Sequence, residues 1–351
     1  MRDALARLIL FSLRFNRIVL LALCCVLGGT KLYAEPLRVN VGPQFSEANI
    51  APALQVLEDS SGNKSIEQIL QEDDTNWQAA DPEEFRAAYS NSAFWLRVRI
   101  NADQTIEPAS RYMLNSDVAF IGNLDYYLVD QEKIQAYHTG LKMPYSARPY
   151  PAENFVLPLT LNPGQSRLIY IRVASEGPIV FPATLYSAEA YHQYHVAKNF
   201  VLGLFFSLCL VLGLYNLFLF FALRDYSYLY YTLNMLVICW FQASMRGFTA
   251  KFLWQDSHPA FSYIEPTLTL VLIYLTNMLF SISFLKLKTE HPRIHQYFIG
   301  LTLICIIMLF NAFTPPLHNL FMAQLYVSPI LVVSSLVAAI YSLTHGNRSA
   351  R

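Results

Sequence analysis

The feature that most limits the fold of this chain is a long stretch without formal charge near its C-terminus. No Asp, Glu, Lys or Arg occurs between Arg293 and Arg348. The stretch is too long for one membrane span, because a helix needs only about 20 residues to cross the hydrocarbon. The paired prolines of FTPPLHN, residues 313–319, interrupt it, since proline cannot continue a helix. We therefore expect two spans here, near residues 297–312 and 320–343.

Three further apolar runs precede this stretch, at residues 200–223, 227–245 and 266–285. Each is close to the length that crosses a bilayer. Only Arg224 and Asp225 separate the first run from the second, so the chain must reverse direction there within a few residues. The sequence thus predicts a polytopic α-helical membrane region that begins with a tight helical hairpin.

The N-terminus has the organisation of an export signal. Arginines precede a short apolar core at residues 18–27, and Ala34 is a suitable residue before a cleavage site. We predict a signal peptide over residues 1–34. An uncleaved anchor is the alternative, but the apolar core is shorter than a membrane span.

The distribution of basic residues gives the orientation of the membrane region, predicted over residues 200–345. If the N-terminal half is exported, the first span enters the cytoplasm, and basic residues should gather in the inside loops. The inside loops and the predicted cytoplasmic end, residues 346–351, hold six basic residues against two outside. The inside residues are Arg224, Lys286, Lys288, Arg293, Arg348 and Arg351, and the outside residues are Arg246 and Lys251. This orients a multi-pass membrane protein with its exported N-terminal domain outside the cytoplasm.

The exported part, residues 35–190, reads as an all-β domain. In FWLRVRI, residues 94–100, apolar side chains alternate with Trp95, Arg97 and Arg99, as in a strand with two different faces. Turn sequences such as LNPGQS separate several such runs, which favours a sandwich or barrel. The part from Glu35 to Val196 has 20 acidic and 11 basic residues, a net charge of −9, which argues against nucleic-acid binding. Residues 191–199 would form a linker leading into the membrane.

Several segments resemble a known family. VLEDSSGNKSIEQIL, FWLRVRI and HTGLKMPYSARPY resemble the type-2 extracellular domain of bacterial seven-transmembrane receptors with diverse intracellular signalling modules. GLYNLFLFFALRDYSYLYYTLN and the later RGFTAKFLW, with Gly247, resemble the start of the family's membrane region. The resemblance implies a jelly-roll-like sensor for carbohydrate-type ligands, seven spans and a cytoplasmic output module, such as a diguanylate cyclase or histidine kinase. The sequence stops at Arg351, after five expected spans, so we expect the output activity to lie outside this chain.

Three residues on one strand face form the candidate ligand site. Trp95 would offer an aromatic plate to a sugar, and Arg97 and Arg99 would donate hydrogen bonds to its hydroxyl groups. Tyr127 and Arg148 are weaker candidates for the same site. The alternative is that Trp95 belongs to the core and that the arginines form ion pairs on a solvated face.

The sequence predicts no catalytic residue, cofactor or metal. It contains no phosphate-binding glycine loop and no nucleophile or zinc motif of the familiar hydrolases. His192 and His195 have a helical spacing that two metal ligands could share, but an aromatic belt at the membrane surface explains them more simply. We therefore do not expect an enzyme.

These observations favour a receptor that transmits ligand binding through its helices. Asn216, Arg224 and Asp225 are the candidate coupling residues, because polar groups link helices and a short turn couples two helices stiffly. A non-signalling binding or assembly protein of the envelope is the first alternative, and a transporter is the second. The expected partners are a small or carbohydrate ligand and the lipid bilayer. Homodimerisation is left open.

Overall fold

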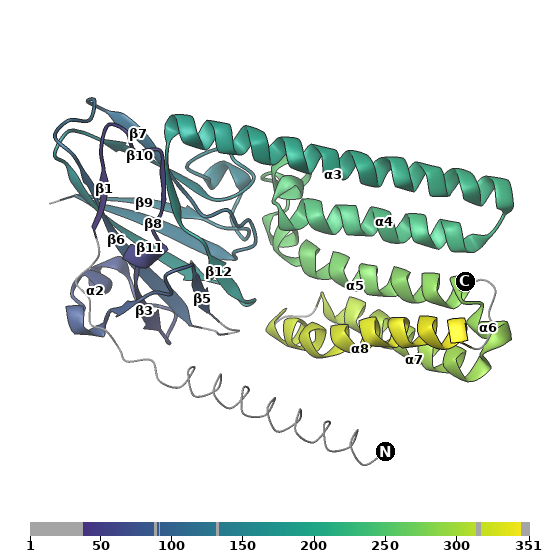
Figure 1. Cartoon of the computed structure of the whole chain (residues 1–351). Helices are drawn as coiled ribbons and strands as arrows, with labels where there is room; N and C mark the ends of the chain where they lie inside the picture. The colour runs from purple at the N-terminus through teal and green to yellow at the C-terminus, as the bar shows by residue number, and fades with distance from the viewer. Residues whose placement is uncertain (1–37, 88–89, 91, 131–132, 314–316, 345–351) are drawn as a thin grey trace, which may run out of the picture. The chain divides into compact units, whose positions relative to one another are not determined.

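The structure is a computed structural model that describes residues 38–87, 90, 92–130, 133–313 and 317–344 (Figure 1). The predicted signal peptide and the predicted cytoplasmic end at residues 346–351 lie outside the described residues. The remaining chain forms a β domain followed by a helical region, which confirms the predicted fold class. The jelly-roll connectivity stays a prediction.

The larger sheet of the β domain has seven strands, in the order β4-β3-β6-β11-β8-β9, with β1 paired to β6. Every pairing in it is antiparallel except that of β1 with β6. The strands are β1 Arg38–Val41, β3 Gln55–Asp59, β4 Gln78–Ala79, β6 Ala93–Ala102, β8 Asn123–Asp130, β9 Lys133–Thr139 and β11 Ser166–Ala174. The predicted strand at residues 94–100 is thus β6, which lies inside the sheet.

A second sheet has four strands in the order β10-β7-β13-β2. These are β2 Glu47–Asn49, β7 Ser110–Asn115, β10 Val156–Leu161 and β13 Thr184–Ser187, and a separate pair joins β5 Phe85–Ala87 to β12 Ile179–Phe181. One buried cluster contains Leu96 and Val98 of β6 together with Leu114 of β7 and Leu157 of β10. The main core therefore joins side chains of both sheets, as in a sandwich.

The opposite face of β6 is also covered. Two short helices, α2 Ile66–Leu70 and the 3-10 turn η2 Asp74–Asn76, belong to the segment between β3 and β4. Helix α2 begins with a capping box, in which the backbone N–H of Ser65 donates to Oε1 of Gln68 at 2.9 Å. Ile66 and Ile69 pack with Trp95, so the face that carries the candidate ligand residues is not an open surface.

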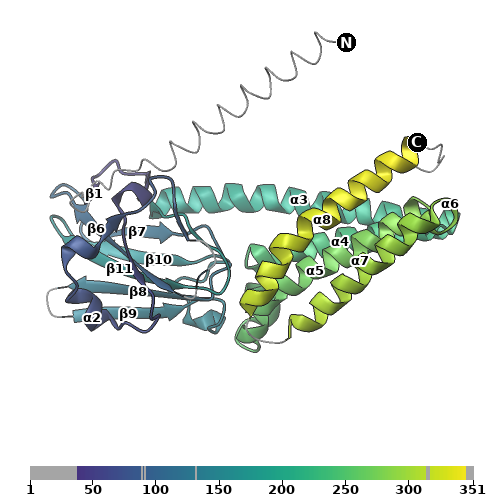
Figure 2. The same cartoon turned by 90° about the horizontal axis from the view of Figure 1, so that it is seen from below.

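The helical region contains five long helices (Figures 1 and 2). They are α3 Ala188–Leu223, α4 Tyr226–Met245, α5 Pro259–Phe284, α7 Pro292–Asn311 and α8 Leu317–Thr344, with the π-helix η4 Ala250–Trp254 and the short α6 Leu287–Glu290 between them. In length and hydropathy, four of the described helices could span a membrane, namely α3, α5, α7 and α8. Helix α4 coincides with the second predicted span, and its crossing of the bilayer stays a prediction.

The described long helices begin earlier than the apolar runs suggested, and α3 and α5 differ most. Helix α3 starts directly after β13, with Ser187 as its N-cap, so the predicted linker at residues 191–199 is part of the helix. Helix α5 starts at Pro259, whereas the apolar run starts only at Pro266 because Glu265 interrupts it. Apolar runs mark where charge is absent, and helical hydrogen bonding continues beyond them.

Candidate functional site

Trp95 and Arg97 of β6 and Tyr127 of β8, three of the predicted ligand residues, come together on the covered face of the larger sheet. Trp95 is fully buried, and its ring stacks on that of Tyr127 with 5.5 Å between centroids and an interplanar angle of 27°. We call the surrounding group the Trp95 cluster; its buried members are Leu57, Ile66, Ile69, Trp77, Trp95, Tyr127 and Tyr170. Trp95 thus lies in the core, which is the alternative to a ligand-binding role that the sequence left open.

Arg97 lies at the edge of the Trp95 cluster, where its Nε and NH1 atoms have polar partners. Its Nε donates to Oε1 of Gln55 at 2.7 Å, and its NH1 lies 2.7 Å from a carboxylate oxygen of Asp74. The same guanidinium stands over the ring of Trp77, 4.3 Å from its centroid. Asp74 itself is exposed, so the ion pair connects the cluster to solvent.

Two indole N–H groups of the Trp95 cluster are left without an acceptor. Nε1 of Trp77 and Nε1 of Trp95 are both buried and have no hydrogen-bond partner among the described residues. A buried donor without a partner costs about 1–3 kcal/mol. A molecule with hydroxyl oxygens could accept from these two groups once the covering segment opened.

The structure does not bring Arg99 and Arg148 into this cluster. Arg99 is half-buried and stands opposite Arg38 of β1 and Leu168 of β11 in the sheet register. Arg148 is buried, and its NH1 donates to the carbonyl oxygens of Ala152 and Glu153, each at 2.8 Å. Burial lowers the pKa of Arg148 to about 10. Its described contacts organise the segment that follows β9, and whether either arginine binds ligand stays a prediction.

A second polar group joins the β domain to the helices. The carboxylate of Glu153 is buried and accepts from Nε2 of His195 in α3 at 3.1 Å. It also faces the ammonium groups of Lys198 at 3.8 Å and Lys251 of η4 at 3.7 Å. We call these four residues the Glu153 cluster. One carboxylate of the β domain therefore contacts two separate helical segments.

The charge of Glu153 is stabilised where it lies. Burial alone would raise its pKa, but hydrogen bonds from its own backbone N–H and from His195, and the charges of His195 and Lys198, hold the pKa below its ordinary value. Nearby, Lys198 also pairs with Asp117, which accepts a 2.7 Å hydrogen bond from the hydroxyl of Tyr194. His195 therefore belongs to this ion cluster. From the sequence alone it could have been a metal ligand or a residue of the membrane interface.

At Gly247 the backbone of the helical region closely approaches that of the β domain. The φ of Gly247 is +78°, in the left-handed region, and a Cβ built on this residue would come within 1.9 Å of the carbonyl oxygen of Glu153. Only glycine is compatible with both conditions. In the sequence, only the family resemblance of RGFTAKFLW drew attention to Gly247. The residue that it approaches, Glu153, lies far away in the chain, so no local pattern indicates the contact.

Tyr263 of α5 forms another contact with the β domain. Its hydroxyl accepts from the backbone N–H of Glu176 at 3.0 Å, and its ring stacks on Phe120 at 5.6 Å with an angle of 9°. The ammonium of Lys142 lies 4.6 Å from the centroid of the same ring. No pattern in the sequence distinguished Tyr263 from the other aromatic residues near the membrane.

The predicted coupling residues occupy different settings. Arg224 ends α3 in a left-handed conformation with φ of +55°, and Asp225 caps α4 by accepting from the backbone N–H of Ser227 at 2.9 Å. Asn216, in contrast, donates to Leu212 of its own helix. Hydrogen bonds that connect helices include those of Asn234 with Thr276, at 2.8 Å, and of Asn277 with Ser335, at 3.1 Å.

Glu265 is a charged residue within α5. The structure buries it to 2% exposure in α5. Its carboxylate accepts from Nε1 of Trp254 and the hydroxyl of Thr249, both at 2.8 Å, and from Nε1 of Trp240. These three donors link α4, α5 and the segment between them around one carboxylate.

Comparison with known families agrees with this division of the chain. Residues 51–187 match the family described as 7TMR-DISM extracellular 2, and residues 198–351 match the family described as 7TM diverse intracellular signalling. Both parts of the resemblance noted in the sequence are confirmed. A comparison with curated proteins found no match. The chain is a multi-pass membrane protein with an extracellular N-terminal sensor domain.

Proposed function

We propose that this chain, which belongs to the seven-transmembrane receptors with diverse intracellular signalling, detects a carbohydrate-like ligand in the bacterial periplasm. In this proposal the protein lies in the inner membrane, and its helices carry the binding signal toward a cytoplasmic output module. No residue of this chain is assigned a catalytic role.

The Glu153 cluster is the observation that carries the proposal of signal transmission. Its buried carboxylate contacts His195 and Lys198 in α3 and Lys251 in η4. A shift of the segment around Glu153 would therefore change the contacts of both α3 and η4. Tyr263 adds a contact to a third helical element, α5. A ligand that favours one arrangement of these contacts would shift the population of helix packings.

The support for a carbohydrate-like ligand is chemical. The Trp95 cluster combines stacked aromatic rings, the guanidinium of Arg97 and two indole donors that lack acceptors. Sugars present both apolar ring faces and hydroxyl oxygens, which match these groups. Because the cluster is covered by α2 and η2, the proposal requires the segment between β3 and β4 to open when ligand binds.

The test is ligand-dependent stabilisation of the full chain in lipid nanodiscs against a panel of neutral glycans. A ligand that binds only the folded state raises Tm, and at 100 times its Kd it adds about 2.7 kcal/mol. We expect a glycan that stabilises the wild type to lose its effect in Arg97→Gln. Arg167→Gln is the matched control, because Arg167 pairs only loosely with Asp130, at 3.8 Å. Stabilisation that persists in Arg97→Gln would move the site elsewhere.

A further inference from the structure

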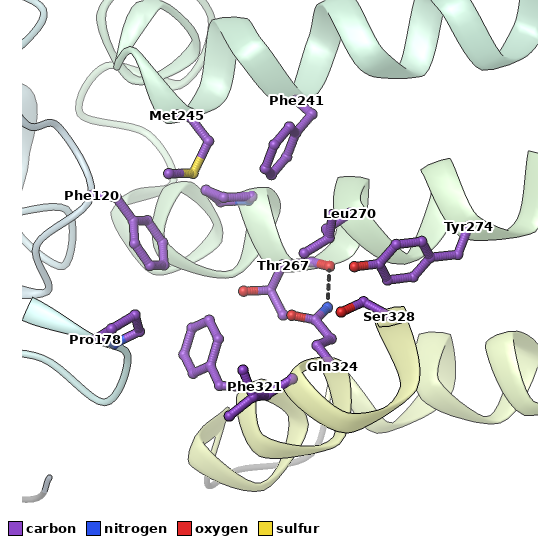
Figure 3. Close-up of a pocket in the computed structure, with 12 residues that line it drawn as sticks. Phe120, Pro178, Phe241, Met245, Thr267, Leu270, Tyr274, Phe321, Gln324 and Ser328 are labelled. Carbon is purple, nitrogen blue, oxygen red and sulfur yellow. Dashed lines mark hydrogen bonds between the residues drawn. The ribbon is translucent and has the colours of Figure 1, made fainter. Parts of the chain in front are cut away.

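A cavity of about 280 Å³ lies where the β domain meets α4, α5 and α8 (Figure 3). Phe120 reaches it from the β domain, Phe241 from α4 and Phe321 from α8. The rings of Phe120 and Phe321 contact each other edge to face, with 5.9 Å between centroids. None of these residues belongs to the Trp95 cluster, so the cavity is separate from the proposed carbohydrate site.

One wall of the cavity is polar. The hydroxyl of Thr267 is buried and has no hydrogen-bond partner within the part of the chain that the structure describes. Gln324 is 5% exposed, and its Nε2 donates to the backbone oxygen of Thr267 at 3.0 Å. That bond orients the amide, so its oxygen and the Thr267 hydroxyl point toward the side where Phe120 and Phe321 lie (Figure 3).

The lining indicates the kind of molecule that fits. Among the described residues, those that line the cavity carry no formal charge, so a charged ligand would lose its hydration without gaining an ion pair. The volume is near the lower end of the roughly 300–1,000 Å³ that is usual for ligand sites, which favours a small molecule. A lipid acyl chain would fill the space but leave the Thr267 hydroxyl unpaired.

We propose that this cavity binds a small, neutral, mostly apolar molecule with one hydrogen-bonding group. The apolar body packs against Phe120, Phe241 and Phe321, and the polar group pairs with Thr267 and Gln324. Such a ligand touches the β domain and three helices at once. The ligand would therefore act, from a second site, on the same packing equilibrium as the periplasmic ligand. The proposal of this second site does not depend on the carbohydrate proposal.

The experiment uses indole as the probe and indene as its matched analogue without the N–H group. Binding to the full chain in phosphatidylcholine nanodiscs is measured by equilibrium dialysis, with empty nanodiscs to subtract partition into lipid. We expect saturable indole binding that is about two- to tenfold tighter than that of indene, the range of one hydrogen bond. In Gln324→Leu and in Thr267→Val, indole should bind no more tightly than indene.

Leu270→Trp fills the cavity and should abolish saturable binding. Leu336→Trp is the control, because it places the same side chain on a 60% exposed position of α8 and should leave binding unchanged. Uptake equal to that of empty nanodiscs, or indole binding retained in Leu270→Trp, overturns the proposal. If Leu270→Trp does not fold, Gln324→Leu decides: an unchanged preference for indole over indene rejects the site. Glycan-dependent stabilisation is measured separately, so either proposal can fail alone.

Discussion

The carbonyl oxygen of Glu153 lies 1.9 Å from the point where a Cβ on Gly247 would stand. This relationship joins the extracellular β domain to the segment that follows α4. On the same residue, the side chain of Glu153 holds three basic groups, so both its backbone and its carboxylate define the junction.

The first prediction concerns Gly247→Ala. The added methyl group must displace backbone at Glu153 and also meets the Cβ of Ala119 at 2.8 Å, while the positive φ adds strain. We expect a loss of about 1–3 kcal/mol of folding free energy, measured as a lower Tm or urea midpoint in nanodiscs. Gly203→Ala is the control, since nothing lies within 4 Å of its Cβ position and alanine favours a helix. Equal stability of the two variants would contradict the close approach.

The second prediction concerns acid stability. Because the folded state lowers the pKa of Glu153, its stabilising contribution is complete above the ordinary value of 4.5 and is lost as the pH falls through the folded pKa. Glu153→Gln should therefore be less stable at pH 7, by about 3 kcal/mol, and should lose less stability between pH 5 and pH 3. Thermal melts across this range measure both effects. Glu189→Gln, at an exposed position of α3, should follow the wild-type curve.

The third prediction separates the two contacts of Tyr263. Tyr263→Phe keeps the stacking on Phe120 but leaves the backbone N–H of Glu176 without its hydroxyl acceptor, so we expect a loss of about 1 kcal/mol. Tyr263→Ala also removes the ring and should cost about 3–5 kcal/mol. Chemical unfolding compares the variants, with Tyr226→Phe at a 61% exposed position as the control. A Tyr263→Phe variant as unstable as Tyr263→Ala would show that the ring contributes little.

The fourth prediction concerns the first two helices. Cys209 in α3 and Cys239 in α4 carry free thiols that lie near each other, so a mild oxidant should join them in an intramolecular disulfide. Peptide mass spectrometry after alkylation should find both thiols protected together, with Cys305 still alkylated. If α3 moves against α4 during signalling, the crosslink should abolish the response of a full-length receptor, and Cys239→Ser should restore it in oxidant. A response that survives a complete crosslink would exclude such a motion.

Local patterns predicted much of the fold. The alternation around Trp95 predicted β6, and the single charged pair at Arg224 and Asp225 predicted the turn between α3 and α4. These features depend on neighbours within a few residues, so the sequence carries them directly.

The junction could not be predicted in the same way. Glu153, Lys198 and Lys251 are spread over about a hundred residues, and each looks like an ordinary surface charge until the fold brings them together. The burial of Glu265 was equally hidden from the sequence, since it depends on indole donors from α4 and from the segment before α5. The sequence left open whether Trp95 binds ligand or belongs to the core, because alternation does not show that α2 covers the second face of β6.

The direct continuation of β13 into α3 has a mechanical consequence. Ser187 ends the strand and caps the helix, and the 36 residues of α3 correspond to a rod about 54 Å long. The hydrocarbon core is only about 30 Å thick, so a rod of this length reaches well beyond it. A tilt of the strand by about 5° would swing the far end of such a rod by about 5 Å, roughly the pitch of one helical turn. A small rearrangement of the β domain at Ser187 would thus become a larger displacement of the loop at Arg224 and Asp225.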